Sequence, residues 1–436
     1  MRVDWELQPR DEPYALIYFI NLVISNTFVL EIKSLMKKSS QEKSPLLIIF
    51  LVVFIDLVGF GIMIPILPYY AKQFGASALT LGILMSSYSA MQFLFAPIWG
   101  GISDRIGRRP VVLISLLGSV ISLTILGFAQ SIGWLLAGRI FSGICGANIS
   151  TASAYIADIT TPENRAKGMG LIGAGFGLGF IFGPAIGGIL SVYGYGVPMF
   201  FAAFVAALDL VFAYFALPEP KKHEESFSAK RKYIDRNLLR ELFQKDPRSV
   251  LAIFIFAIIT LAFTQIEVSF ALYMLAKFDF DAKHAGYFLA LMGLIGASVQ
   301  GGAIGKLSRK FGESNLILFG TGLMCISLIG FVSANQLSSV TICILFLAFG
   351  NALNNPSLSS LASKGAPNNK RGATMGVFHS FASLSRILGP IFGGFLFDHF
   401  GKNAPFSSAA IIYGIICFSL IFMTQSGIFG LRSKPD

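Results

Sequence analysis

The 436-residue sequence has little charge and few residues of the kinds that build reactive sites. Asp, Glu, Lys and Arg make up 13% of it, and it holds four cysteines and four histidines. A soluble chain of this length needs about 25% charged residues to cover its surface, so a soluble globular protein is disfavoured. The cysteines lie in apolar segments without metal-ligand spacing, and neither an H-E-x-x-H nor a G-x-S-x-G motif occurs. The sequence therefore predicts no enzyme activity, no cofactor and no metal site.

Long apolar runs take the place of the missing charge, since 54% of the residues are hydrophobic and 42 are phenylalanine. Twelve of these runs reach about 20 residues, which is enough to cross the hydrocarbon core of a bilayer as a helix. The sequence thus predicts an all-α membrane protein with twelve transmembrane helices. The predicted spans are 46–70, 79–101, 111–130, 133–157, 168–193, 197–217, 249–276, 285–306, 315–334, 337–362, 372–397 and 405–427.

The net charge of +11 is distributed unevenly between the two sides of the predicted membrane. If the chain starts on the cytoplasmic side, cytoplasmic segments hold 26 of the 34 Lys and Arg residues, and the translocated loops hold four. This asymmetry follows the positive-inside rule, which explains the basic charge by orientation alone. Nucleic-acid binding is therefore not indicated, and the lipid bilayer is the expected partner.

The chain contains an internal repeat. Gly183-Pro184-Ala185-Ile186-Gly187-Gly188 returns 206 positions later as Gly389-Pro390-Ile391-Phe392-Gly393-Gly394. The segment 100–109 returns 205 positions later in a degenerate form, with Arg309 in place of Asp104. Repeated halves of this kind are typical of transporters with alternating access. The predicted domains are an N-terminal extension and tail (1–44), a six-helix bundle (45–217), a cytoplasmic linker (218–248), a second six-helix bundle (249–428) and a tail (429–436).

The N-terminal extension includes an apolar stretch before Met36, which would add a thirteenth span and disturb the charge pattern. Met36-Lys37-Lys38 resembles the natural start of a cytoplasmic tail. We therefore hypothesise that residues 1–35 do not belong to the natural chain and are dispensable.

The segment Gly100-Gly101-Ile102-Ser103-Asp104-Arg105-Ile106-Gly107-Arg108-Arg109-Pro110 connects two predicted spans. It is short, so the flanking helices run antiparallel, and its three arginines favour the cytoplasmic side. The spacing resembles the G-x-L-S-D-R-x-G-R-R/K signature of the major facilitator superfamily, over nearly the whole chain. The resemblance implies two pseudo-symmetric six-helix bundles around a central cavity. It also implies a cytoplasmic gate with a charge network of Gly100, Asp104, Arg105, Gly107, Arg108, Arg109, Asp158 and Arg165.

The fifth span carries Gly175, Gly179, Gly183 and Gly187 at intervals of four, so that these glycines line one helix face. Ordinary tight packing explains part of this pattern. The sequence Gly179-x-x-x-Gly183-Pro184-x-x-Gly187-Gly188 also resembles the antiporter motif of the superfamily, which is found mostly among exporters. The resemblance implies a bent helix that seals the bundle against leakage.

Ionisable groups deep in predicted spans are costly and usually functional, and three of them are the leading candidates for proton coupling. Arg139 begins a segment that resembles the R-x-x-Q-G-x-G-A-A motif of drug:proton antiporters, with Ser142 in place of the usual Gln. Asp56 begins a D-x-x-G-x-G-x-x-x-P-x-L-P pattern close to the first helix of tetracycline-resistance exporters. We expect Asp56, paired with Arg139, to carry a proton, and Glu267 is a second candidate. A structural Asp56 and a snorkelling Arg139 are the alternatives.

Further polar residues within the spans are expected to line the cavity, although hydrogen bonds between helices would produce the same pattern. These candidates are Asn148, Asn351, Asn354, Asn355, His379 and Arg386. Asp209 in the sixth span is expected only to pack against a polar partner.

These motifs together resemble the drug:proton antiporter branch, with tetracycline-resistance and multidrug efflux proteins. The resemblance implies a monomeric transporter of the bacterial inner membrane that exports lipophilic small molecules in exchange for protons. The ninth span lacks the carboxylate on which tetracycline exporters rely, so tetracycline itself is not specifically indicated. The alternatives are a metabolite or siderophore exporter or importer of the same fold, and a non-transporting membrane receptor or scaffold.

Overall fold

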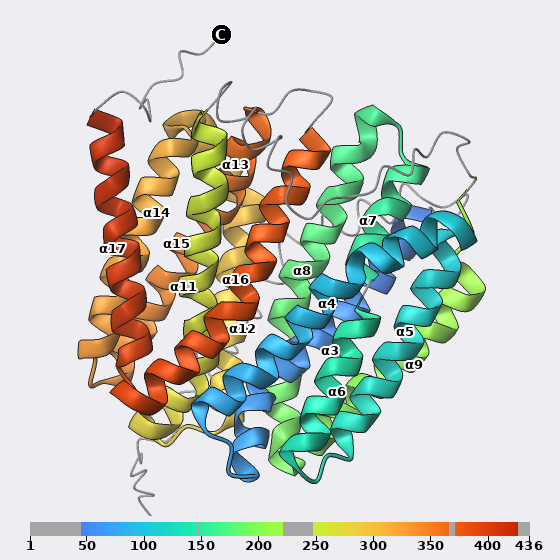
Figure 1. Cartoon of the computed structure of the whole chain (residues 1–436), viewed down its shortest axis with the longest axis horizontal. Helices are drawn as coiled ribbons and strands as arrows, with labels where there is room; N and C mark the ends of the chain where they lie inside the picture. Colours follow the sequence, from blue (N-terminus) through green and yellow to red (C-terminus); the bar gives the residue numbers. More distant parts are fainter. Residues whose placement is uncertain (1–44, 147, 221–246, 366–370, 426–436) are drawn as a thin grey trace, which may run out of the picture.

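A computed structural model describes residues 45–146, 148–220, 247–365 and 371–425, and within these ranges all regular structure is helical (Figure 1). The predictions about residues 1–35, the core of the linker and the C-terminal tail fall outside the described residues. Twelve described segments are long and apolar enough to cross a membrane, which confirms the predicted all-α membrane class. The helices are α3 (Pro45–Gln73), α4 (Ala78–Ile106), α5 (Arg108–Gly127), α6 (Ile132–Cys145), α7 (Asn148–Ile159), α8 (Pro162–Leu190), α9 (Gly196–Ala216), α11 (Pro247–Phe278), α12 (Ala282–Ser298), α13 (Ile304–Phe311), α14 (Glu313–Ser333), α15 (Leu337–Lys364), α16 (Arg371–Phe400) and α17 (Ala404–Gln425).

Single glycines make the sharpest connections between these helices. Gly107 alone separates α4 from α5 and has φ 106°, and Gly312 alone separates α13 from α14 with φ 77°. Both values lie in the left-handed region, which glycine adopts without steric cost. Since the two glycines are 205 positions apart, the repeat preserves the turn even where its charges differ.

Two membrane spans are interrupted, whereas the sequence predicted continuous helices over 133–157 and 285–306. The eighth span passes from α12 to α13 through a π-helical turn, Val299–Ala303, which holds two glycines. The fourth span breaks between α6 and α7 at Gly146, which has ψ 43°. Glycine has a low helix propensity, which favours an interruption at both places.

Side chains from neighbouring helices bind the carbonyl groups that the end of α6 leaves free. Trp99 donates to the oxygen of Ile144 (2.6 Å), Gln92 to that of Gly146 (3.0 Å), and Ser115 to that of Cys145. In a membrane, backbone irregularity is tolerated only where the protein itself supplies such partners. The interruption therefore depends on α4 and α5 as much as on α6.

The helices form two groups. In Figure 1, α3 to α9 occupy one side of the molecule and α11 to α17 the other. The groups meet chiefly through α4 with α16 and α8 with α12, while α3 and α11 lie at the centre and pack against α8 and α16 respectively. The predicted domain boundaries themselves stay predictions.

Large apolar side chains cover the outer helices. Phe204 and Phe215 of α9 are 61% and 82% exposed, and Ile411 and Phe418 of α17 are 63% and 73% exposed. Exposure of so many large apolar side chains to water is unfavourable, so this surface is suited to contact with lipid tails. The polar groups that lie between the two helix groups are therefore the ones that require a functional explanation.

Candidate functional site

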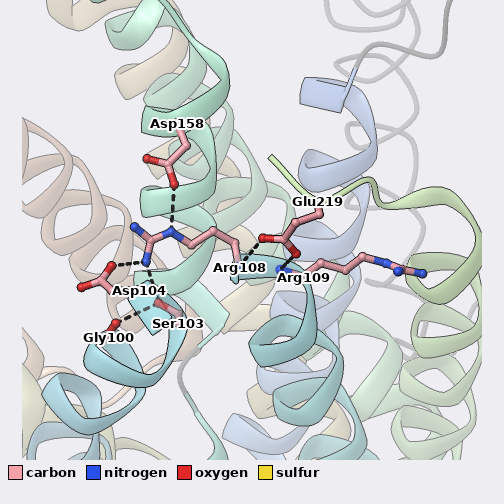
Figure 2. A network of polar contacts seen from close by, with 7 residues as sticks. All are labelled: Gly100, Ser103, Asp104, Arg108, Arg109, Asp158 and Glu219. Atoms are coloured by element: carbon pink, nitrogen blue, oxygen red, sulfur yellow. Dashed lines mark hydrogen bonds and ion pairs between the residues drawn. The ribbon is translucent and has the colours of Figure 1, made fainter. Parts of the chain in front are cut away.

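A network of charges joins the end of α4, the start of α5 and the end of α7 (Figure 2). The guanidinium of Arg108 donates from Nε to Asp158 (2.8 Å) and from Nη1 to Asp104 (2.5 Å). The same Nη1 also donates to the hydroxyl of Ser103 (2.6 Å). Figure 2 shows Arg108 between the two acids. The guanidinium of this α5 residue therefore joins the end of α4 to the end of α7. The structure thus brings Asp104, Arg108 and Asp158 together.

Glu219, which sequence reasoning missed, completes this network. Its carboxylate accepts hydrogen bonds from the backbone N–H groups of Arg108 (2.7 Å) and Arg109 (2.9 Å). A carboxylate in this position satisfies free donors at the start of α5 and interacts favourably with the helix dipole. A Cβ at Gly107 would lie 2.5 Å from Glu219 Oε1, so glycine is required there for space as well as for backbone conformation.

The remaining gate candidates lie around this network. The side chain of Arg109 donates to the carbonyl of Tyr214 (2.5 Å) and lies 5.5 Å from the centre of its ring. Arg105 is exposed, and the side chain of Arg165 lies outside the described residues.

The corresponding positions of the second half carry opposite charges. Glu313, at the start of α14, pairs with Lys364 at the end of α15 and accepts from the hydroxyl of Ser360 (3.0 Å). Glu313 lies 205 positions after Arg108, and Lys364 lies 206 positions after Asp158. The two halves therefore make equivalent ion pairs with the signs exchanged.

Glycines of α8 bring this helix into backbone contact with α3. A Cβ at Gly183 would lie 2.6 Å from the Cα of Gly61, and one at Gly187 would lie 2.4 Å from the oxygen of Ile62. A Cβ at Gly179 would meet the backbone of Leu57 at 2.9 Å. The antiporter-like motif is thus a close-packing surface within the first half.

The last glycine of each repeated segment packs across the interface between the two helix groups. A Cβ at Gly188 would lie 3.1 Å from the backbone oxygen of Lys283 on α12. Its counterpart Gly394 packs against the start of α4, where a Cβ would lie 2.2 Å from the oxygen of Ala78. These contacts lie at the end of the molecule opposite the charge network.

Asp398 adds a polar link at the same end of the molecule. Its carboxylate, at the end of α16, accepts from the backbone N–H groups of Ala78 (3.0 Å) and Leu79 (2.9 Å) at the start of α4. A residue of one helix group thereby caps a helix of the other. Nearer the membrane centre, Ser86 donates to the carbonyl of Ile387 (2.6 Å) across the same interface.

Several glycines in the segments of α4, α8, the eighth span and α16 nearer the charge network have free space beside them. A Cβ at Gly168 would lie 2.6 Å from Ile156 and one at Gly177 would lie 3.3 Å from Ala297 of α12, whereas a Cβ at nine other glycines would meet no atom within 4 Å outside its own helix turn. These glycines are Gly100, Gly101, Gly170, Gly173, Gly296, Gly301, Gly302, Gly372 and Gly376. The tightest glycine contacts between the two helix groups therefore lie toward the end of the molecule opposite the charge network.

Arg139 lies in α6 and is 3% exposed. It donates to the backbone oxygens of Leu84 and Met85, each at 3.2 Å, and its guanidinium lies 4.6 Å from the ring centre of Tyr88. These partners satisfy the cation without requiring a bonded carboxylate.

Charged groups of both halves surround Tyr88. Its hydroxyl interacts electrostatically with Asp56, Arg139 and Arg386, and Glu267 interacts with both arginines. Glu267 is half-buried on α11, whereas Arg386 on α16 is exposed although it lies deep within a membrane span. The structure therefore gathers Arg139 of the first half and Glu267 and Arg386 of the second around one central point.

Asp56, the proton-carrier candidate of the first span, has a hydrogen-bond partner other than Arg139. Asp56 Oδ1 accepts a hydrogen bond from Ser119 of α5 (3.2 Å). The predicted pairing of Asp56 with Arg139 stays a prediction, and Tyr88 is the residue that interacts with both.

The cavity candidates fall in several places. His379 is exposed and interacts electrostatically with Arg386 on the same helix, while Asn351 and Asn355 are half-buried on α15. Asn354 is fully buried and donates to Thr321 (3.3 Å) of α14, which matches the alternative of a hydrogen bond between helices. The side chain of Asn148 lies outside the described residues. Within the described ranges, no group of three His, Cys, Asp or Glu residues is placed to hold a metal ion.

The family model for the Major Facilitator Superfamily matches residues 49–390 and 304–428. This chain belongs to that superfamily. It is 31% identical to Multidrug resistance protein 2 of Bacillus subtilis (strain 168), over 86% of this chain and 94% of that protein. It is also 31% identical to Tetracycline resistance protein, class C, of Escherichia coli, over 80% of this chain and 89% of that protein.

Solved structures share the fold of this superfamily member. The human organic anion transporter MFSD10 (TETRAN) superposes with a TM-score of 0.67 at 24% identity, over 87% of this chain and 100% of that chain. A bacterial homolog to the human lysosomal transporter Spinster, in an inward-facing and occupied conformation, gives 0.74 at 16% identity, over 90% and 98%. Membership of the superfamily identifies the chain as a multi-pass membrane transporter rather than an enzyme.

Proposed function

We propose that this transporter exports lipophilic small molecules in exchange for protons, as a monomer in the inner membrane of a bacterium. The multidrug and tetracycline resistance proteins that it resembles support export. The close-packed α8 glycines support it as well, since exporters of the superfamily carry most motifs of this kind.

The observation that carries the proposal is the position of Glu267 in the electrostatic field of Arg139 and Arg386. Arg139 belongs to the first half, and Arg386 and Glu267 belong to the second. An ionised Glu267 attracts Arg139 across the interface, and a protonated Glu267 does not. Proton binding at Glu267 therefore changes how strongly the two halves are held together, which is what coupling of protons to alternating access requires.

The cycle follows from these charges. In the inward-open form, a substrate from the cytoplasm reaches the half-buried Glu267 and the exposed Arg386. Substrate binding then favours release of a proton from Glu267 or Asp56 into the cytoplasm. The halves rock to open outward, the substrate leaves, and a proton from outside restores the acid and favours the return.

Substrate-induced proton release from purified protein in detergent tests the coupling. Lipophilic cations and tetracycline are added in a weakly buffered solution to the unmodified protein, Asp56→Asn and Glu267→Gln. Asp279→Asn is a matched control, because Asp279 is exposed in an outer loop and has φ 54°, which asparagine tolerates. We expect release to be lost in at least one of the two intramembrane variants and kept in the control. Substrate binding without proton release from the unmodified protein would contradict antiport.

The charge network is proposed to control the conformational equilibrium rather than to bind substrate. Asp104→Ala removes one of the two acids that hold Arg108. We expect this variant to bind substrate normally and to lose transport. Normal efflux by Asp104→Ala would exclude the gating role.

An exposed Arg386 beside His379 favours a second candidate, a carrier of anionic metabolites such as a siderophore, for export or import. Arg386→Gln separates the two functions. Loss of binding for carboxylate compounds but not for lipophilic cations would support the second candidate, and the reverse would support drug export.

A further inference from the structure

Asp209 of α9 is a buried acid that the proposed cycle does not use. Its side chain is 0% exposed, and neither carboxylate oxygen has a hydrogen-bond partner among the described residues. Sequence reasoning expected a polar partner for it. The helix is flanked mainly by α3 and α5, so Asp209 lies inside the first half and away from lipid.

A carboxylate without partners is very costly in an apolar interior, whereas the neutral acid costs far less. The surroundings of Asp209 therefore favour the protonated form. A protonated aspartic acid needs one acceptor at most, and it leaves no net charge in the core.

Among the described residues, Asp56 is the charged group that acts on Asp209. The two carboxyl groups interact electrostatically, and they lie at comparable depths, about 16 Å and 10 Å from the cytoplasmic ends of α3 and α9 at 1.5 Å per residue. On α5 the charged residues, Arg108 and Arg109, stand at the cytoplasmic end, and the described side chains of α8 include no titratable group.

We propose that Asp209 is a second proton-binding site and that it titrates together with Asp56 as a coupled pair. When Asp56 is ionised, its negative charge strengthens proton binding at Asp209, and the reverse holds equally. The first half would then hold one proton on the pair even while Asp56 is charged. The inference deepens the proposed function, on which its consequence for transport rests, but occupancy of Asp209 by a proton is testable without it.

Infrared difference spectroscopy over a pH titration reports the protonation directly, through the carbonyl stretching band of a neutral carboxylic acid. We expect such a band at neutral pH in the unmodified protein. The band should vanish in Asp209→Asn, persist in Asp56→Asn, and shift in frequency in Asp209→Glu, which keeps the acid. If Asp209→Asn does not fold, the frequency shift of the band in Asp209→Glu still assigns the band to residue 209.

The coupling between Asp56 and Asp209 is measured separately, through the pH midpoint at which the Asp209 band disappears. In Asp56→Asn the like charge is absent, so the midpoint at which the Asp209 band disappears should fall by at least about one pH unit, a tenfold loss of proton affinity. Absence of an Asp209 band at neutral pH would overturn the site. An unchanged midpoint in Asp56→Asn would overturn the coupled pair.

This experiment distinguishes the inference from the proposed function. If substrate releases no proton but the Asp209 band is present and coupled, antiport fails and the second proton site stands. If substrate releases protons but the band is absent, antiport stands and the second site fails.

Discussion

At the end of the molecule that carries the charge network, the two halves are built alike but charged oppositely. In the first half, Arg108 at the start of α5 pairs with Asp158 at the end of α7. In the second half, Glu313 at the start of α14 pairs with Lys364 at the end of α15. A helix start favours an anion and a helix end favours a cation, so the second pair agrees with both helix dipoles and the first opposes both.

The first half offsets this opposition with additional groups. Glu219 supplies the anion that the start of α5 would otherwise lack, and Asp104 gives Arg108 a second acid. The counterpart of Asp104 is Arg309, which among the described residues donates to the carbonyl of Gly305 (3.1 Å) on its own helix. We conclude that the second half holds a simple static link, while the first half holds a balanced network that a small change can shift.

The most damaging change should be Arg108→Glu, which places a third acid between Asp104 and Asp158. We expect transport to fall by more than tenfold and the protein to lose about 2 kcal/mol of stability, since two charge-assisted hydrogen bonds become repulsive contacts. Transport assays in vesicles and thermal unfolding in detergent measure both effects.

Because the two halves carry the same ion pair with opposite signs, a second substitution should compensate for Arg108→Glu. Adding Asp158→Lys to Arg108→Glu recreates the arrangement of Glu313 and Lys364, and it should restore most of the stability. The matched control in the second half is Glu313→Lys combined with Lys364→Glu, where helix dipoles now oppose the pair. A double variant of the first half as unstable as Arg108→Glu alone would contradict the equivalence.

Glycine contacts allow a second comparison of the halves. A Cβ at Gly183 would meet the Cα of Gly61 at 2.6 Å, so Gly183→Ala must separate two backbones. A Cβ at its counterpart Gly389 would meet the hydroxyl of Thr264, a movable side chain, and the backbone oxygen of Leu261 at 2.8 Å. We expect Gly183→Ala to cost about 1–3 kcal/mol and Gly389→Ala less, because one of the two groups near Gly389 can move, measured as unfolding free energies in detergent.

Gly173→Ala is the control on the same helix as Gly183, since a Cβ there would meet nothing within 4 Å. It should leave stability unchanged or raise it slightly, because alanine favours the helix. Equal losses at Gly173 and Gly183 would show that helix propensity, rather than contact with α3, explains the glycines.

Much of this architecture could be predicted from the sequence, because hydrophobic length and short charged loops are local signals. The twelve spans, the superfamily and the absence of an enzyme fold were confirmed. Glu219 was missed because it stands 111 residues from Arg108, and no local pattern marks a cap supplied from that distance. The break after α6 was missed for a related reason, since it depends on Trp99 and Gln92 of another helix.

The candidate site was harder to predict than the fold. Buried charges in the spans were recognised as costly, but their partners follow from packing rather than from spacing. Asn354 illustrates this limit, because the same residue pattern fits a cavity wall and a hydrogen bond to Thr321, and only its complete burial distinguishes them.

The outer ends of the two halves differ as well, and Asp398→Ala tests that difference. Asp398 of α16 links the halves by accepting hydrogen bonds at the start of α4, in addition to the cap that Ser77 provides there, whereas α12 is capped by its own preceding residue, Asp281. Loss of a cap costs about 1 kcal/mol, and here that cost falls only on the outward-closed form. We expect a roughly fivefold shift toward the outward-open form, measured as faster labelling of a cysteine placed at Gln73. Asp281→Ala should not change that labelling, and an equal effect of both variants would remove the special role of Asp398.

The smallest expected effect concerns the cap of α12 and its dependence on pH. Burial alone would raise the pKa of Asp281, but hydrogen bonds from the backbone and ring of His284 outweigh it and hold the pKa below its usual value. A lowered pKa in the folded protein adds stability above the ordinary value of about 3.9, and this stability is lost as the pH falls through the folded pKa. Asp281→Asn should therefore lower the unfolding temperature slightly at pH 6 and have no effect at the acid end of the titration. Because the pair is exposed and local, the change should stay within about 1 kcal/mol, the usual contribution of a helix cap. A larger change that also altered the opening of the outer side would mean that the cap of α12, like that of α4, depends on contact between the halves.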